Sequence, residues 1–174
     1  GLICVNGEFG ARLVQQARRI GLQFEVYEVR WREPFKRECI EVFAGEAAWF
    51  AFVHGETSTG MLNDLDMFVE IKKQFGLLLA VDCVSSFGAV PFSLRNVDFA
   101  SATSGKAIGA LAGLSFLFYG GKPVSGGALY TDLAQYDGRL PFTLPAYLVN
   151  NVSTALEEYP TRFVALAERL EQVL

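Results

Sequence analysis

Two ionisable side chains follow, or lie within, stretches of small and apolar residues where a charge is unusual. Asp82 follows the apolar run 77–81, and Lys106 is the only charged residue between Ser101 and Gly113. A carboxylate at the end of a buried strand is costly unless a cation meets it. Apolar, glycine-rich surroundings lower the pKa of a lysine by desolvation, which makes its amine a better nucleophile. The two residues together predict a site in which Lys106 attacks a carbonyl group and Asp82 pairs with a cation.

Each residue alone has a simpler interpretation, and the sequence leaves these alternatives open. Asp82 alone fits a helix cap or a loop salt bridge, and Lys106 alone fits a solvated lysine in a loop. The cation at Asp82 is either Lys106 or the protonated ring nitrogen of a bound pyridoxal phosphate, whose electron-withdrawing ring needs such a carboxylate. A phosphate-binding P-loop is excluded, because that pattern requires a glycine at Ala100 and a serine or threonine at Ala107.

The composition predicts one globular domain and excludes several classes of function. The 174 residues carry a net charge of −4 without a long basic run, which argues against binding of nucleic acid. The apolar stretch 107–119 is too short and too interrupted by glycine to span a membrane. Cys4, Cys39 and Cys83 are widely spaced and His54 is the only histidine, so neither a disulfide framework nor a metal site is expected. The amino end lacks the basic segment of a signal peptide, which predicts a cytoplasmic location.

Short apolar runs alternate with stretches of helical periodicity along the chain. We expect strands at residues 2–5, 24–29, 47–54, 77–84, 97–104 and 114–120. We expect helices at residues 9–20, 35–44, 63–75, 145–158 and 160–174, the last with Pro160 in its first turn. Alternation of this kind predicts βαβ units, and therefore an α/β fold with three αβα layers around a mostly parallel sheet.

Three polar clusters occur where predicted strands end. They are "HGETSTG" (54–60), "DCVSS" (82–86) and "SATSGK" (101–106). Ligands of open parallel sheets bind at the carboxyl ends of the strands. Because these ends lie at one edge of a parallel sheet, we expect the three clusters, with Asp82 and Lys106, to form one site.

Five segments carry a family resemblance when they are taken together and in this order. They are "NGEFGAR" (6–12), "VHGETSTGMLNDL" (53–65), "VDCVSSFGAVPFSL" (81–94), "DFASATSGKAIGALAGLSFLF" (98–118) and "TLPAYL" (143–148). In this combination the chain resembles the class V aminotransferases of pyridoxal-phosphate fold type I, with residues 1–174 corresponding to their large, cofactor-binding domain. The resemblance implies transfer of an amino group from a small amine or amino acid, of the 2-aminoethylphosphonate or alanine type, to an α-keto acid such as pyruvate or glyoxylate.

The resemblance implies a role for each of five residues around the cofactor ring. Lys106 would form a Schiff base with the cofactor and later move a proton between substrate and cofactor. Asp82 would pair with the pyridinium nitrogen. Val84 would pack on one face of the ring and Phe9 on the other, while Thr57 would hydrogen-bond the phenolic oxygen of the ring.

Binding of the phosphate and of the substrate is implied less completely. Ser104 would help to hold the phosphate, and Thr143 belongs to a segment that in the family reaches the phosphate of a neighbouring subunit, which implies a homodimer. The chain departs from the family at Gly105, where a side chain that binds phosphate is usual. Family members also have a glycine-containing phosphate turn before this region and a carboxylate-binding arginine after it. We expect the chain to lack both, with Arg12 and Arg139 as candidate substitutes for the arginine.

Two other functions stay open beside transamination. One is a truncated or degenerate relative without activity, which serves as a folded, partner-binding module, and Gly105 favours this interpretation. The other is a different pyridoxal-phosphate reaction on the same fold, such as that of a lyase. A cysteine desulfurase is disfavoured, because neither Cys39 nor Cys83 stands in a segment that predicts a mobile loop.

Overall fold

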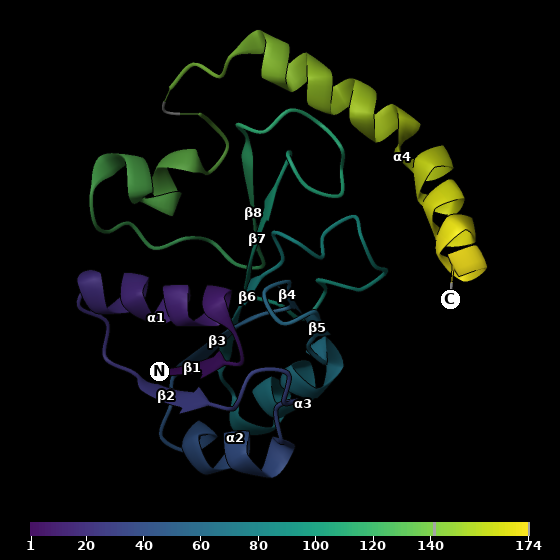
Figure 1. The fold of residues 1–174 in the computed structure, drawn as a ribbon. Helices are drawn as coiled ribbons and strands as arrows, with labels where there is room; N and C mark the ends of the chain where they lie inside the picture. Colours follow the sequence, from purple (N-terminus) through teal and green to yellow (C-terminus); the bar gives the residue numbers. More distant parts are fainter. Residues whose placement is uncertain (141, 174) are drawn as a thin grey trace.

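A six-stranded sheet forms the centre of the structure, a computed structural model that describes residues 1–140 and 142–173. Its strands are β1 (Leu2–Val5), β2 (Glu25–Glu28), β3 (Trp49–Val53), β6 (Leu78–Asp82), β7 (Phe99–Thr103) and β8 (Ser115–Tyr119). The strand order is β2-β1-β3-β6-β7-β8. The first five strands in this order run parallel and β8 runs antiparallel to β7 (Figure 1). The predicted α/β fold with a mostly parallel sheet is confirmed.

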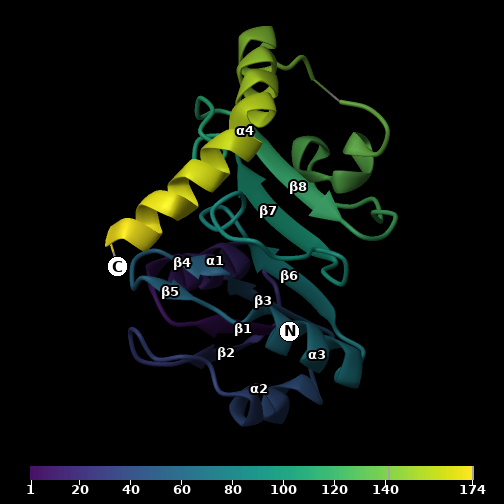
Figure 2. The ribbon, with the colours of Figure 1, turned by 90° about the vertical axis from the view of Figure 1, so that its right-hand side faces the viewer.

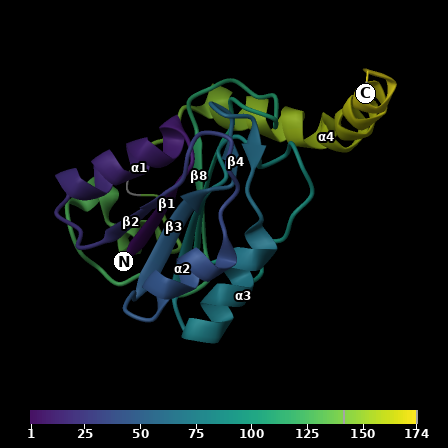
Figure 3. The same ribbon diagram turned by 60° about the horizontal axis from the view of Figure 1, so that its bottom comes forward.

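Helices cover both faces of this sheet. The described residues contain α1 (Glu8–Arg19), α2 (Arg37–Ala44), α3 (Leu65–Phe75) and α4 (Ala146–Val173), the 3-10 turns η1 (Leu129–Thr131) and η2 (Leu133–Tyr136), and a small ribbon of β4 (Gly55–Glu56) and β5 (Met61–Leu62). Helix α1 lies on one face, and α2 and α3 lie on the other, which gives three layers (Figure 3). No helix within the described residues is both long enough and apolar enough to cross a bilayer.

The larger core fills the space between the sheet and helices α2 and α3. Phe68 of α3 is fully buried, with its ring stacked on Phe52 at 3.7 Å between centroids and edge-on to Phe35 at 5.7 Å. Helix α3 is closed at both ends, because the Asp64 side chain caps its first turn and Gly76 adopts a left-handed φ of 70° after its last. This core holds β3 and β6 in place, and both strands end at the candidate site.

The face that carries α1 is packed over only part of the sheet. Val14 and Ala17 of α1 are buried against Ile3 and Val5 of β1. Beside α1 the same face opens into a hollow of about 150 Å³, which is lined by Leu13 and by residues of β3, β6, β7 and β8. Figure 2 shows β7 and β8 extending past α1 towards α4. One side of β6 and β7 therefore remains accessible next to the carboxyl ends of these strands.

The C-terminal region differs from the prediction of two helices at 145–158 and 160–174. The structure has one helix, α4, with Pro160 inside it, and residue 174 lies outside the described residues. A proline inside a helix removes one backbone hydrogen bond and bends the helix, and α4 is bent along its length (Figure 2). The helix continues through Pro160, and Tyr159 and Arg162, on either side of it, are both hydrogen-bonded to the body of the domain.

Candidate active site

The carboxyl ends of β3, β6 and β7 are held level with one another. Val53 of β3 pairs with Asp82 of β6, which pairs in turn with Ser101 of β7. The hydrogen bonding continues one residue beyond the strands, from His54 N to Asp82 O and from Cys83 N to Ser101 O, each at 2.9 Å. The three polar clusters that follow these strands consequently lie at one edge of the sheet, as the sequence predicts.

Asp82 presents its side chain on the accessible face of the sheet. Its carboxylate is half-buried and borders the hollow beside α1, and Oδ1 accepts a hydrogen bond from Val84 N at 2.9 Å. The ion pairs of residues 1–140 and 142–173 do not include Asp82. A half-buried carboxylate without an internal cation is ready to pair with a cationic group of a ligand. The same hydrogen bond fixes the backbone of Val84 next to the carboxylate.

Lys106 lies in a compact turn that follows β7. The hydroxyl of Ser104 donates to Leu111 O at 2.6 Å and accepts from Leu114 N at 3.2 Å, and Gly109 N donates to Lys106 O at 2.8 Å. The Lys106 side chain is exposed, so the predicted desolvation of this lysine by its small neighbours is wrong for this structure. Ser104 is fully buried and its hydroxyl closes the turn. Its predicted contact with a phosphate stays a prediction.

Gly105, the departure from the family pattern, is explained by the packing of this turn. A Cβ atom at position 105 would lie 2.7 Å from the Cβ of Ala112 and 2.8 Å from its Cα. Contacts this short force the neighbour to move, so no side chain fits at position 105 while the turn keeps this shape. Ala112 occupies the space that a side chain at position 105 would need.

Helix α4 holds the two turns that carry Asp82 and Lys106. Tyr159 Oη donates to Gly88 O at 2.8 Å, in the loop that follows Asp82. The guanidinium of Arg162 donates to Ile108 O at 2.9 Å, in the turn of Lys106. One helix therefore fixes the positions of both turns relative to each other.

Phe9 and Thr57 are brought together by side chains that the sequence analysis did not single out. Phe9 is half-buried in the first turn of α1, and the Arg12 guanidinium carbon lies 5.2 Å from its ring centroid. Thr57 is exposed in the turn after β4. Between them, the fully buried Glu56 bonds to the first turn of α1. In the sequence, Glu56 is visible only as a carboxylate that follows Gly55 in the polar cluster 54–60. That pattern does not show that Glu56 is buried.

His54, the first residue of the polar cluster 54–60, has a role that the sequence did not reveal. It is buried, its Nδ1 lies 2.9 Å from Ser86 Oγ, and its ring is edge-on to Phe92 at 4.6 Å between centroids. Burial lowers the pKa of His54 below its usual value, and the nearby Asp66 carboxylate opposes this only in part. His54 therefore acts as a neutral side chain that ties the end of β3 to the turn after β6.

The remaining candidates are Thr143, Arg139 and Arg12. Thr143 is exposed in the segment that leads into α4. Arg139 donates to the side-chain oxygen of Gln135 at 3.0 Å, within its own segment. Arg12 lies near Phe9 but also 3.9 Å from the Glu8 carboxylate. Arg12 is therefore placed beside Phe9, a predicted site residue.

A known protein family matches most of this chain. The family model described as Aminotransferase class-V matches residues 3–124. The chain belongs to the class-V aminotransferases. One curated relative is the 2-aminoethylphosphonate–pyruvate transaminase of Pseudomonas entomophila (strain L48), which is 30% identical over an alignment of 174 residues covering 91% of this chain and 47% of the relative. This aminotransferase chain thus spans about half the length of the curated relatives it matches.

Solved aminotransferase structures share the fold. An alanine–glyoxylate aminotransferase from Nostoc sp. superposes with a TM-score of 0.79 at 32% identity, over 90% of this chain and 46% of that chain. An aspartate aminotransferase of subgroup IV from Thermus thermophilus gives a TM-score of 0.83 at 28% identity, over 94% of this chain and 50% of that chain. The family resemblance inferred from the five sequence segments is confirmed.

His54→Gln is expected to change how the stability of the chain depends on pH. Because burial lowers the pKa of His54 in the folded state, the unfolded state binds more protons below the ordinary histidine pKa of about 6.5. The wild-type free energy of unfolding should therefore fall more steeply than that of the variant as the pH drops below about 6.5. One group contributes a difference in slope of at most about 1.4 kcal/mol per pH unit.

Urea unfolding between pH 7.5 and pH 5 measures both slopes. His54 is the only histidine, so the variant has no other histidine titration to confuse the comparison. Parallel curves for the two proteins over this range would show that His54 is not held neutral by the fold.

Proposed function

We propose that this chain is the cofactor-binding part of a pyridoxal-phosphate-dependent aminotransferase. The observation that carries the proposal is the Asp82 carboxylate, which is half-buried at a strand end and has no basic partner within the described residues. Its strand is the neighbour of the strand that leads into the Lys106 turn. Membership of the class-V aminotransferases supports the same chemistry.

The residues at this edge fit pyridoxal phosphate by their chemistry. When bound, this cofactor supplies an electron sink through its protonated pyridine ring. Asp82 would keep the proton on the ring nitrogen, because its carboxylate favours the charged form of a partner. Val84 and Phe9 would exclude water from the two faces of the ring, and Thr57 would donate to its phenolic oxygen.

Lys106 would act as the nucleophile and the proton carrier of the site. Its amine is exposed on a turn that is held by internal hydrogen bonds and by Arg162 of α4. On this hydrogen-bonded turn the Lys106 amine would hold the aldehyde of the cofactor, and its Nζ would accept the proton of the amino donor's α-carbon. Ser104 would keep this turn in the required shape next to the phosphate.

The named relatives indicate the substrate class. We propose a small amine or amino acid, of the 2-aminoethylphosphonate or alanine type, as donor and an α-keto acid such as pyruvate or glyoxylate as acceptor. Arg12, beside Phe9, is the proposed partner for an anionic substrate group. We place the enzyme in the cytoplasm, since its cysteines Cys4, Cys39 and Cys83 are free, as is usual in a reducing compartment.

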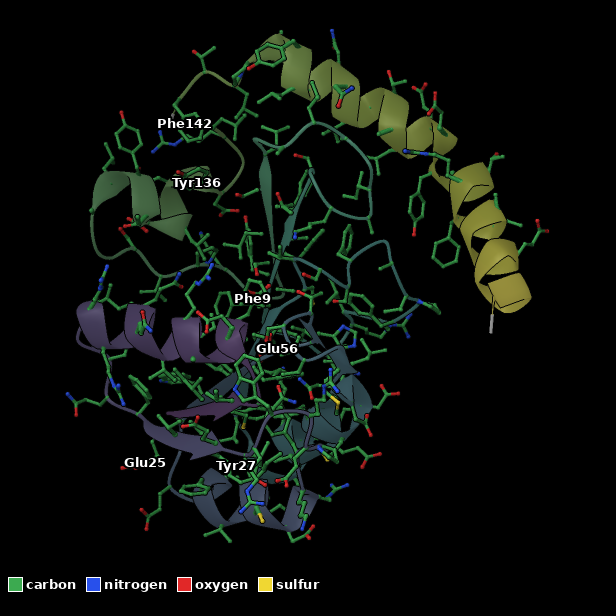
Figure 4. The ribbon with its side chains drawn as sticks, in the orientation of Figure 1. Phe9, Glu25, Tyr27, Glu56, Tyr136 and Phe142 are labelled. Atoms are coloured by element: carbon green, nitrogen blue, oxygen red, sulfur yellow. The ribbon has the colours of Figure 1, made fainter. Side chains whose placement is uncertain are left out.

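We also propose that the enzyme is a homodimer in which Thr143 faces a neighbouring subunit. The segment around Thr143 carries three large exposed side chains, Tyr130 at 64%, Phe142 at 43% and Tyr147 at 66% exposure. Figure 4 shows Phe142 near Tyr136, away from α1 and its Phe9. The rings of Tyr130 and Phe142 lie 6.3 Å apart between centroids, and exposed aromatic side chains of this kind are typical of protein interfaces.

Lys106→Ala is expected to abolish covalent attachment of the cofactor, because no other amine occupies the turn after β7. The chain is incubated with pyridoxal phosphate, reduced with borohydride and mapped by peptide mass spectrometry. Lys122→Ala, which removes another exposed lysine, is the matched control and should leave the labelling of Lys106 intact. A label on Lys122 contradicts the assignment of Lys106. Wild-type protein without any label also contradicts it and favours a non-catalytic relative.

Asp82→Asn is expected to leave the chain folded and to slow amino transfer at least about a hundredfold, or about 2.7 kcal/mol of transition-state stabilisation. The reason is that a neutral amide no longer holds the proton on the ring nitrogen. The rate is measured with alanine and with 2-aminoethylphosphonate at saturating pyridoxal phosphate. Asp66→Asn, an exposed carboxylate of α3, is the matched control. An unchanged rate in Asp82→Asn with intact folding rules out the ring-nitrogen role.

A further inference from the structure

The N-terminal end of α1 is capped by side chains from a distant segment. Glu56 is 0% exposed, and its carboxylate accepts from Gly10 N at 3.0 Å and from Phe9 N at 3.4 Å. Ser58 Oγ donates to the same carboxylate at 2.6 Å and accepts from Glu8 N at 3.0 Å. Three successive N–H groups of the first turn, which a helix cannot satisfy internally, are therefore bonded to residues 46 to 50 positions away.

The sequence of α1 is shaped to admit this carboxylate. The residue at the N-cap is Gly7, which has no side chain to cap the helix itself. A Cβ at Gly7 would lie 2.5 Å from Cγ and Cδ of Glu56, so any larger residue would displace the carboxylate. Gly10 permits the close approach of α1 to β1, since its Cβ would lie 3.1 Å from Val5 Cα. Gly7 of "NGEFGAR" thus leaves the space in which Glu56 and Ser58 of "HGETSTG" cap the helix, and Gly10 lets that helix lie close to β1.

A buried carboxylate is stable here because of where it lies. Burial of an isolated charge is costly, but the N-terminal end of a helix carries partial positive charge and charge-assisted hydrogen bonds are strong. A glutamine at this position cannot replace it, because an amide has only one acceptor oxygen and its NH₂ group would face the N–H donors of α1. The capping arrangement at Glu56 therefore requires a carboxylate.

We propose that Glu56, with Ser58 as its partner, is a positioning residue for the cofactor. Glu56 is covalently next to Thr57 and is hydrogen-bonded to the backbone of Phe9, so it fixes these two residues relative to each other. Figure 4 shows Phe9 and Glu56 beside each other at the start of α1. The inference rests on the proposed function, in which Phe9 stacks on the ring and Thr57 bonds its phenolic oxygen. Glu56 is fully buried and would act on the cofactor through Phe9, without contacting the ring itself.

The test compares Glu56→Gln with Glu8→Gln. The control makes the same chemical change one residue before Phe9, at an exposed side chain. Hydrogen exchange of the Phe9 and Gly10 amides is measured first, by NMR on the cofactor-free chain. The dissociation constant for pyridoxal phosphate is measured next, in the wild type, in each variant, in Phe9→Ala and in the double variant Phe9→Ala with Glu56→Gln.

Glu56→Gln should speed exchange of the two amides and weaken pyridoxal phosphate binding about tenfold, the loss expected when a hydrogen bond to a charged group is removed. Glu8→Gln should do neither. In the Phe9→Ala background the Glu56→Gln change should add less than about a twofold loss, because the two residues act as one unit. The inference is overturned if the increase in the dissociation constant of the double variant equals the product of the two single-variant increases. It is also overturned if amide exchange in Glu56→Gln is unchanged.

Two further results separate this inference from the proposed function. In the first, the wild-type chain binds no pyridoxal phosphate, while amide exchange is still faster in Glu56→Gln. This result contradicts the proposed function and leaves Glu56 with the role of a helix cap alone. If Glu56→Gln does not fold, Ser58→Ala replaces it, since this change removes one donor to the carboxylate and the acceptor of Glu8 N. The dissociation constants of Ser58→Ala, Phe9→Ala and their double variant are then compared in the same way. Non-additive losses support the inference, and losses that multiply overturn it.

Discussion

The parallel register of β3, β6 and β7 is the constraint on which the rest of the structure depends. Backbone hydrogen bonds place Val53, Asp82 and Ser101 side by side, and they continue one residue past the strands. Since parallel strands end at the same edge, the turns that follow β3, β6 and β7 begin next to one another. A slip of one residue in β6 would move Asp82 to the opposite face, into the core formed with α2 and α3.

The turns at this edge are fixed individually, and each uses a different polar group. The Asp82 carboxylate holds the backbone of Val84, the Ser104 hydroxyl closes the Lys106 turn, and Glu56 caps α1. Helix α4 then bonds to two of the turns at once. Within the described residues every buried side-chain nitrogen or oxygen has a hydrogen-bond partner, whereas the Lys106 side chain at this edge is exposed.

The sequence predicted the elements of the fold better than the contacts between them. Alternating apolar runs were enough to predict a mostly parallel sheet, because its strands and helices show in local periodicity. The pairing of β6 with β7, which sets Asp82 beside the strand that leads into the Lys106 turn, depends on strand order and is seen in the structure. The sequence predicts Pro160 at a helix start, because proline fits that position. The structure instead has Pro160 inside α4, which is hydrogen-bonded to the domain on both sides of the proline. The roles of Glu56 and His54 depend on burial and on partners far away in sequence, which no local pattern reveals.

The central claim is that residues from four separate segments form one site for one cofactor. A titration of the isotope-labelled chain with pyridoxal phosphate, followed by amide chemical shifts, tests it directly. The account predicts that the amides of Phe9, Thr57, Val84 and Lys106 shift together and saturate with one dissociation constant, while Leu78 at the opposite edge does not move. Shifts confined to one of these segments, or different dissociation constants for different segments, would contradict it.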